Sequence, residues 1–66
     1  MKLRIDRETD ALYFRLDDSN IVESEEVQPG VILDFNERGQ VVGIEMLHIS
    51  ERVDAQKLQS LQFDMA

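Results

Sequence analysis

The sequence contains no cysteine, and this absence excludes both a covalent cross-link and a class of metal ligand. Disulfide bonds and thiolate metal sites are excluded outright. The 66 residues form one domain at most, and a single core of that size rarely supplies more than about 3–5 kcal/mol. Because small scaffolds usually need a disulfide, a metal or a partner subunit, we expect a homodimer.

Long apolar runs are also missing. No stretch approaches the ~18 apolar residues that a membrane-spanning helix needs. The first residues, MKLRID, lack the apolar segment and the cleavage pattern of a secretory signal. We therefore expect a cytoplasmic protein with no membrane partner, and the lack of cysteine fits a reducing compartment.

Positive charge is scarce, since seven Lys and Arg residues face fourteen Asp and Glu residues, for a net charge of −7. An acidic surface repels phosphate backbones, and the few basic residues are scattered along the chain. Direct binding of nucleic acid is therefore disfavoured. A basic protein partner or a cation is electrostatically easier, although the same acidity also serves solubility alone.

What the chain does contain is five short runs of strand-forming residues separated by turn signals. The predicted strands are Lys2–Asp6, Ala11–Leu16, Ile21–Gln28, Val31–Phe35 and Val41–Met46. Connections this short join antiparallel neighbours, because parallel pairing needs a crossover of a dozen or more residues. The sequence thus predicts an antiparallel β-meander over residues 1–47.

Alternation along these strands predicts which side chains share a face. The turn after Asp6 sets Leu3 opposite Phe14 and Ile5 opposite Leu12, and the turn after Phe35 sets Val31 opposite Ile44 and Leu33 opposite Val42. One face is then a complete apolar layer. Its predicted members are Leu3, Ile5, Leu12, Phe14, Leu16, Val31, Leu33, Phe35, Val42, Ile44 and Met46.

After Met46 the apolar spacing becomes helical. Leu58, Leu61 and Met65 fall on one stripe, with Phe63 well off it, and Ser50 or Asp54 is the candidate N-cap. We predict a C-terminal helix over residues 50–65, packed on one face of the sheet. The fold class is then α+β, with residues 1–66 forming a single domain.

The second face of the predicted sheet mixes apolar and polar residues, whereas a solvated face alternates more cleanly. This mixture favours a partner or a second copy on that face. The candidate contact residues are Tyr13, Arg15, Ile32 and Val41, and a Tyr beside an Arg is typical of interface anchors.

The acidic run from Ile21 to Gln28 raises a chemical alternative. If this strand pairs with Ala11–Leu16, then Glu23 and Glu25 lie on the apolar face, where two carboxylates could bind a cation or act as an acid–base pair. The structural alternative is a short or bulged edge strand, whose charges discourage pairing with other molecules.

His48, the only histidine, is followed by Ser50 and Glu51. A histidine, a hydroxyl and a carboxylate suggest nucleophilic catalysis, but three residues within one tetrapeptide rarely point at a common centre. One histidine also makes no structural zinc site without further ligands. We therefore predict no catalytic residue, no metal site and no cofactor, and we keep His48 as a weak candidate for a ligand site.

The ordered motifs of the chain resemble a known family. The motifs are Asp10-Ala11-Leu12-Tyr13-Phe14-Arg15-Leu16, Glu23-Ser24-Glu25-Glu26-Val27, Pro29-Gly30-Val31-Ile32-Leu33-Asp34-Phe35 and Val41-Val42-Gly43-Ile44-Glu45-Met46-Leu47. Over residues 5–53 the chain resembles the small prokaryotic "domain of unknown function 2283" family. The resemblance implies a compact sheet-plus-helix domain without established catalytic residues, and some members are suspected to be antitoxin-like partners of a small toxin.

Two functions follow as expectations. The first is a non-enzymatic, homodimeric interaction module that binds a basic protein partner in an antitoxin-like manner. The second is a protein that binds a small ligand or a cation, or a weak hydrolase, using Glu23, Glu25 and His48. The second requires these three side chains to converge.

Overall fold

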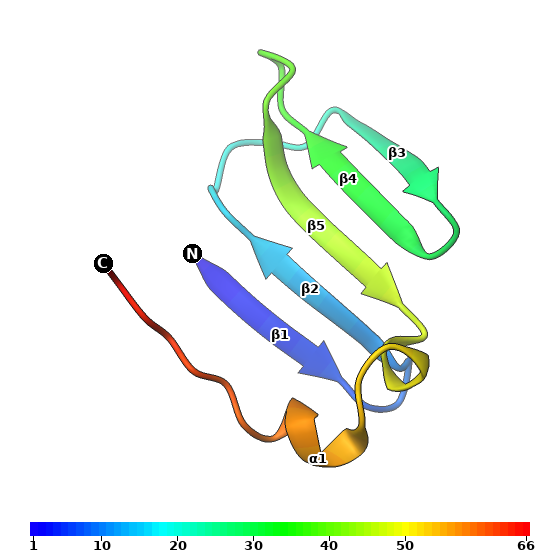
Figure 1. Ribbon diagram of the computed structural model, residues 1–66. Coiled ribbons are helices and arrows are strands. Elements are labelled where there is room, and N and C mark those ends of the chain that lie inside the picture. Colours follow the sequence, from blue (N-terminus) through cyan, green and yellow to red (C-terminus); the bar gives the residue numbers. More distant parts are fainter.

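The computed structural model describes residues 1–66 and shows one antiparallel sheet of five strands (Figure 1). The strands are β1 (Lys2–Asp6), β2 (Ala11–Arg15), β3 (Glu23–Gln28), β4 (Val31–Phe35) and β5 (Val41–Leu47). A 3-10 helix, η1 (Ile49–Glu51), and a short helix, α1 (Ala55–Leu58), follow the sheet. All five strands were expected from the sequence, and their bounds agree within one residue except at the start of β3, which lies two residues later than predicted.

The strand order corrects the predicted meander. The observed order is β1-β2-β5-β4-β3, so β5 lies beside β2 in the centre of the sheet and β3 lies at an edge. The predicted pairing of Leu16 with Ile21 is therefore wrong, and Leu16 instead donates its N–H to the carbonyl of Val42 at 2.8 Å. The other three predicted neighbours, β1–β2, β3–β4 and β4–β5, are confirmed.

Charge explains why β3 lies at the edge and β5 at the centre. Strand β3 carries Glu23, Glu25 and Glu26, and all six of its residues are exposed. A central position would remove these carboxylates from water at a cost of several kcal/mol. The connecting residues 16–22 span up to about 23 Å when extended, which exceeds the roughly 14 Å across three strand spacings. The chain can therefore pass over the ends of β5 and β4, as Figure 1 shows.

The register of the first hairpin matches the prediction, with Leu3 opposite Phe14 and Ile5 opposite Leu12. In the β4–β5 hairpin the predicted register is wrong by two residues, since Leu33 lies opposite Ile44 and Val31 opposite Met46. The reason is an irregularity after Asp34, where Val42 has no partner in the ladder. A shift of two residues keeps Val31, Leu33, Ile44 and Met46 on the predicted face. Phe35 lies opposite Val41 instead of Gln40, a shift of one residue, so these two side chains do not follow the predicted alternation.

The predicted helix over residues 50–65 is wrong in extent. Helix α1 contains only Ala55–Leu58, with Asp54 at the N-cap position and no side-chain hydrogen bond at that cap. Isolated helices shorter than about 12–15 residues are marginal in water without a packed face, and no capping box supports this one. Residues 59–66 continue without helix or strand (Figure 1). The predicted packing of a long helix on the sheet is therefore not observed.

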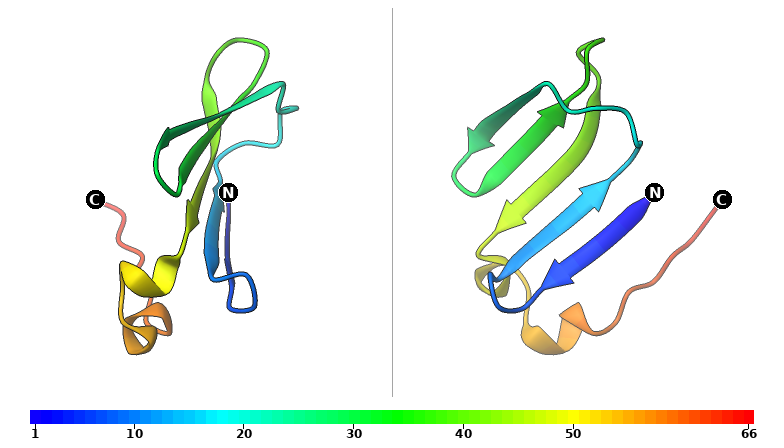
Figure 2. Two further views of the ribbon diagram at one scale, coloured as in Figure 1. Left: turned by 90° about the vertical axis from the view of Figure 1, so that its right-hand side faces the viewer. Right: turned by 180° about the vertical axis from the view of Figure 1, so that it is seen from behind.

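The sheet is a single layer, seen close to edge-on in the left view of Figure 2, with η1 and α1 gathered at one end. No helix in this chain has the length and apolar character needed to cross a bilayer. Only three apolar residues are buried, and they are Val31, Val42 and Ile49. The molecule thus places most of its apolar side chains in positions that water still reaches.

Candidate functional site

The apolar face of the sheet consists of two rows of side chains that cross four strands. The first row is Leu3, Phe14, Ile44 and Leu33, and the second is Ile5, Leu12, Met46 and Val31. The rows run into Glu25 and Gln28 on the edge strand β3. Eight apolar side chains therefore form one continuous surface, which is called the apolar face below.

Little covers this apolar face. Of its eight members only Val31 is buried, and the other seven are partly exposed. Helix α1 reaches one end of it, where Leu58 and Ile5 line the same hollow with Ile49. Monomeric proteins rarely leave large contiguous apolar patches open to water. The open face is therefore the strongest candidate for an interaction surface.

The opposite face, called the polar face below, contains a hydrogen-bonded network centred on Asp34. The Asp34 side chain lies in the middle of the sheet, and the residue is only 2% exposed. The hydroxyl of Ser24 donates to its Oδ1 at 2.6 Å, and the hydroxyl of Tyr13 donates to its Oδ2 at 3.3 Å. Both carboxylate oxygens thus have a partner, which offsets the cost of removing the charge from water.

Gly43 makes room for this network. Gly43 lies directly between Arg15 and Asp34 in the ladder. A Cβ at this position would lie 2.8 Å from Asp34 Oδ2 and 3.1 Å from the Tyr13 hydroxyl. Real Cβ atoms essentially never come within 3.0 Å of another heavy atom, so the Asp34 carboxylate would have to move. The glycine is therefore required by the close approach of a buried carboxylate.

Arg15 joins the same network to the β2–β3 connection. Its Nε donates to the carbonyl of Asp17 and its Nη2 to the carbonyl of Ser19, both at 2.6 Å, while Nη1 donates to the Tyr13 hydroxyl at 3.4 Å. Hydrogen bonds from the side chain and backbone of Ser19 lower the pKa of Asp17 in this connection. The guanidinium thus holds the chain segment that carries β3 to the far edge.

Glu45 lies on the polar face beside this network. Partial burial raises its pKa above the ordinary value of 4.5, and the negative charge of Asp34 and a side-chain hydrogen bond with Asp34 raise it further. Two neighbouring carboxylates resist simultaneous ionisation, and this repulsion adds to the effect of burial on the pKa of Glu45. Glu45 can therefore keep a proton at a pH at which an isolated glutamate has lost it.

The residues predicted as a partner face lie on or beside this network. Tyr13 and Arg15 bond to each other and to their neighbours, and Ile32 lies opposite Glu45 on the same face. Val41 lies at the irregular end of the ladder, opposite Phe35. The polar side chains of Tyr13 and Arg15 are thus engaged within the chain.

Glu23 and Glu25 lie on the edge strand β3, opposite Phe35 and Leu33. Both are exposed, and the register of β3 shifts between Glu26 and Gln28. The predicted burial of these carboxylates through pairing with β2 is wrong, because β2 pairs with β5 instead. The alternative of a bulged, charged edge strand is confirmed.

His48 lies beyond the end of β5, in a left-handed conformation with φ of 53° and ψ of 47°. In the ladder Glu25 is level with Ile44, four residues before His48, a separation along the strand direction of about 14 Å at ~3.4 Å per residue. Glu23 lies farther still along the sheet. The structure therefore does not bring Glu23, Glu25 and His48 together.

The neighbours of His48 have structural partners. Ser50 donates its hydroxyl to Asp10 Oδ2 at 2.6 Å and its N–H to Asp10 Oδ1 at 3.0 Å, which ties η1 to the β1–β2 turn. His48 lines a hollow of about 420 Å³ with Glu26, Glu51 and Arg52, and Arg52 donates to the carbonyl of Pro29 at 3.1 Å. No three His, Cys, Asp or Glu side chains meet where they could share a metal ion.

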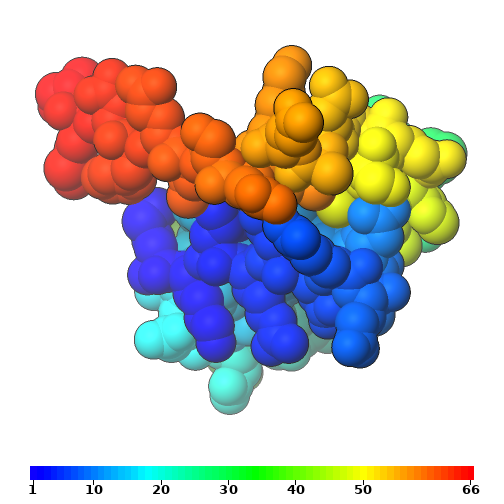
Figure 3. Space-filling model, turned by 90° about the horizontal axis from the view of Figure 1, so that it is seen from below, coloured from blue at the N-terminus to red at the C-terminus, as the bar shows by residue number.

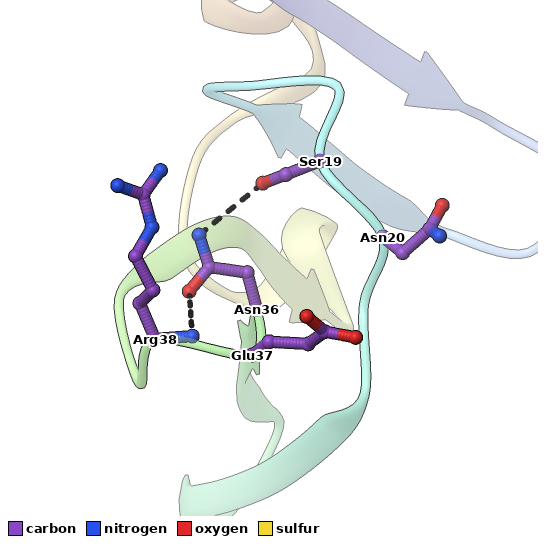
Figure 4. A pocket seen from close by; sticks show the side chains of 5 residues that line it. All are labelled: Ser19, Asn20, Asn36, Glu37 and Arg38. Carbon is purple, nitrogen blue, oxygen red and sulfur yellow. Dashed lines mark hydrogen bonds between the residues drawn. The ribbon is translucent and has the colours of Figure 1, made fainter.

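A second hollow lies at the opposite end of the sheet, lined by Ser19, Asn20, Asn36, Glu37 and Arg38 (Figure 4). Asn36 is 5% exposed and uses its whole amide group. Its Nδ2 donates to Ser19 and Gln40, while its Oδ1 accepts from the N–H groups of Arg38 and Gln40. Asn36 thus shapes the β4–β5 turn and holds it to the β2–β3 connection, and no apolar residue lines the hollow.

Comparison with protein families now adds to this geometry. The family model described as "Protein of unknown function (DUF2283)" matches residues 2–50. The chain belongs to this family. The match covers all five strands and both faces of the sheet, whereas α1 and residues 59–66 lie outside it. No curated protein and no solved structure matches the chain.

Sequence reasoning missed the network around Asp34, although two signals point to it. Asp34 is the only charged residue in the apolar run of β4, and Gly43 is the only glycine inside a strand. A glycine within a strand often marks the close approach of another group. The two signals combine only when the register that sets Asp34 opposite Gly43 is known.

Proposed function

We propose that this protein is a cytoplasmic, non-enzymatic interaction module that forms a homodimer through its apolar face and binds a basic protein partner at its acidic edge. The apolar face carries the proposal: seven of its eight side chains remain partly exposed in the single chain. A second copy placed on this face converts a one-layer sheet into two packed layers, the usual way in which a sheet buries an apolar surface.

The choice of a second copy follows from size and symmetry. A two-fold contact uses the same surface on both subunits, and an apolar surface is complementary to itself. The isolated chain buries only Val31, Val42 and Ile49 among its apolar residues, which is little for a domain without disulfides. The proposal keeps the expected homodimer but places its interface on the apolar face instead of at Tyr13, Arg15, Ile32 and Val41.

Sedimentation of the purified protein over a range of concentrations tests the dimer. Leu33→Gln is expected to weaken dimerisation by about a hundredfold, because each of the two subunits buries an amide without a partner. Ile32→Gln is the matched control, since Ile32 precedes Leu33 in β4, is also partly exposed and faces the other side. A wild-type protein that stays monomeric at high micromolar concentration contradicts the proposal.

The acidic edge supports the second part of the proposal. Strand β3 has one free side, and Glu23, Glu25 and Glu26 are all exposed along it. An extended segment of a partner can add to such an edge by main-chain hydrogen bonds, with specificity from the side chains. Three carboxylates favour a segment rich in Lys and Arg, and attraction of this kind weakens as salt screens it.

The partner is tested with the tagged protein by recovery of a stoichiometric basic protein at low salt. Binding is expected to fall at about 0.5 M salt, where the screening length is only a few ångströms, and in the variant Glu23→Gln, Glu25→Gln, Glu26→Gln. The control neutralises three carboxylates outside β3, with Glu8→Gln, Asp18→Asn and Glu37→Gln. Equal loss of binding in both variants, or binding that ignores salt, contradicts an acidic-edge site.

A further inference from the structure

Four large apolar side chains are almost fully exposed at one side of the molecule. Met1 is 86% exposed, Leu61 72%, Phe63 78% and Met65 82%. The last three alternate with Gln62 and Asp64, which is the period of a strand that has one apolar and one polar side. The sequence of this C-terminal segment thus favours a strand, although it is unpaired in the structure.

The segment begins close to an unpaired strand edge. Strand β1 is the edge strand opposite β3, so its outer side has no partner. Leu58, just before the segment, lines a hollow with Ile5 and Asp6 at the end of β1. From there the chain runs along the β1 side of the molecule in the direction opposite to β1, and it stands clear of the body (Figures 1, 2 and 3).

We infer that residues 61–65 pair with the outer edge of β1 as a sixth antiparallel strand, so that the apolar face that receives the second copy spans five strands instead of four. The inference rests on the proposed dimer and states what its interface contains. The register sets Leu61 opposite Ile5 and Phe63 opposite Leu3, with Met65 beside Met1. All three apolar side chains then extend the apolar face, because directly opposed residues point to the same side.

Charge is also favourable in this register. Gln62 lies opposite Arg4 and Asp64 opposite Lys2, so the polar face gains an acid beside its two exposed basic residues. A slip by one residue would turn Leu61, Phe63 and Met65 to the polar face. A slip by two residues in one direction would move Leu61 beyond the end of β1, opposite Arg7, and in the other direction it would leave Asp64 and Met65 without a partner. Apolar matching and charge pairing therefore agree on one register.

The added strand changes two properties of the molecule. It pairs the N–H and C=O groups on the outer side of β1, which otherwise offer an edge for unwanted pairing. It also lengthens each apolar row by one side chain, with Leu61 continuing the row of Ile5 and Phe63 the row of Leu3. The edge strand that remains open is then the acidic β3, where the proposed partner binds.

Nuclear Overhauser spectroscopy on the full chain tests the pairing directly. Cross-strand contacts are expected between the backbones of residues 62 and 4 and of residues 64 and 2, with slow amide exchange in the segment. A sample that mixes labelled and unlabelled protein identifies which copy supplies the strand. Contacts only between different copies, or no contacts to β1 at all, overturn the inference.

Variants test the contribution to the interface. The triple change Leu61→Gln, Phe63→Gln, Met65→Gln is expected to weaken dimerisation by about tenfold or more, because three apolar side chains leave each half of the interface. The matched control, Gln62→Ser with Asp64→Asn, is expected to stay within about twofold, since both changed residues lie on the polar face. Equal dissociation constants for wild type and the triple variant overturn the inference while the dimer stands.

The two proposals fail separately. If the wild-type protein is monomeric, the proposed dimer falls, and contacts between residues 61–65 and 1–5 within that monomer still establish the sixth strand. A wild-type dimer without these contacts keeps the proposed dimer and overturns the sixth strand, and the apolar face then spans only four strands.

Discussion

On the polar face, a buried carboxylate receives hydrogen bonds from Ser24 and Tyr13, and a glycine leaves it the room it needs. On the apolar face of the same sheet, seven of eight side chains stay partly exposed and nothing in the chain covers most of them. The polar face is satisfied within one chain, whereas the apolar face is not. Specific hydrogen bonds are short-range and fit within one layer, but burial of an apolar sheet requires a second layer.

Crowding the polar face should have the largest effect on the stability of the single chain. Gly43→Ala is expected to lower the free energy of unfolding by about 2 kcal/mol, since the new methyl group overlaps Asp34 and the Tyr13 hydroxyl. Chemical denaturation measures the change. Elsewhere in a strand, replacing glycine by alanine stabilises, so a more stable variant would show that the network does not need this space. In an Asp34→Ala background the same change should cost less.

Removing one donor from the network should have the next largest effect. Ser24→Ala is expected to cost about 1.5 kcal/mol, because the 2.6 Å hydrogen bond to the buried Asp34 carboxylate is lost. Ser60→Ala, at an exposed position without a side-chain hydrogen bond, is the control for the loss of a hydroxyl. Equal free energies of unfolding for the two variants would show that the hydrogen bond from Ser24 to Asp34 does not stabilise the fold.

The proton on Glu45 offers a finer test of the polar face. Its pKa is raised in the folded state, so folded and unfolded chains both hold the proton below pH 4.5. As pH rises above 4.5 the unfolded chain releases the proton first, and the folded protein loses relative stability until its own pKa is passed.

The variant Glu45→Gln has no such proton to lose. It is therefore expected to be more stable than wild type at pH 7 and to show a smaller difference at pH 3. Thermal melts across this pH range measure the effect. A difference that grows as pH falls would reverse the sign and contradict a raised pKa.

Neutralising the acidic edge should have the smallest effect on folding. Glu23→Gln, Glu25→Gln and Glu26→Gln together are expected to change the free energy of unfolding by about 0.5 kcal/mol or less per site, since all three residues are exposed. Denaturation midpoints check this. A large loss of stability would mean that these carboxylates make contacts that hold the fold together, so that β3 is not a free surface for a partner.

The first hairpin shows how much of the fold was predictable. The β1–β2 register follows from a short turn and strict alternation, both of which are local properties of the sequence. The C-terminal helix shows the opposite case, because its apolar spacing fits a helix over Leu58, Leu61 and Met65 and a strand over Leu61, Phe63 and Met65. Which of the two periods forms depends on the surface available for packing. The sheet does not pack against the stripe of Leu58, Leu61 and Met65, and the helix ends at Leu58.

The candidate site divides in the same way. Glu23, Glu25 and His48 were singled out by residue type, and the structure separates them along the sheet. No motif in the sequence marks Asp34 as a candidate site residue, yet it is the most buried charged residue. Its environment is built from β2, β3, β4 and β5 together, so no local pattern reports it.

The sequence by itself determined the number of strands, three of the four hairpin turns and eight of the eleven predicted members of the apolar face, because alternation and turn chemistry act over a few residues. Only the tertiary structure decided that β5 lies beside β2, that β3 takes the edge, and that Asp34 is buried beneath Tyr13 and beside Gly43. These outcomes depend on which distant strands become neighbours. The centre of the sheet can hold either β3 or β5. Placing β3 there would remove three carboxylates from water, whereas β5 is mostly apolar and costs less to bury.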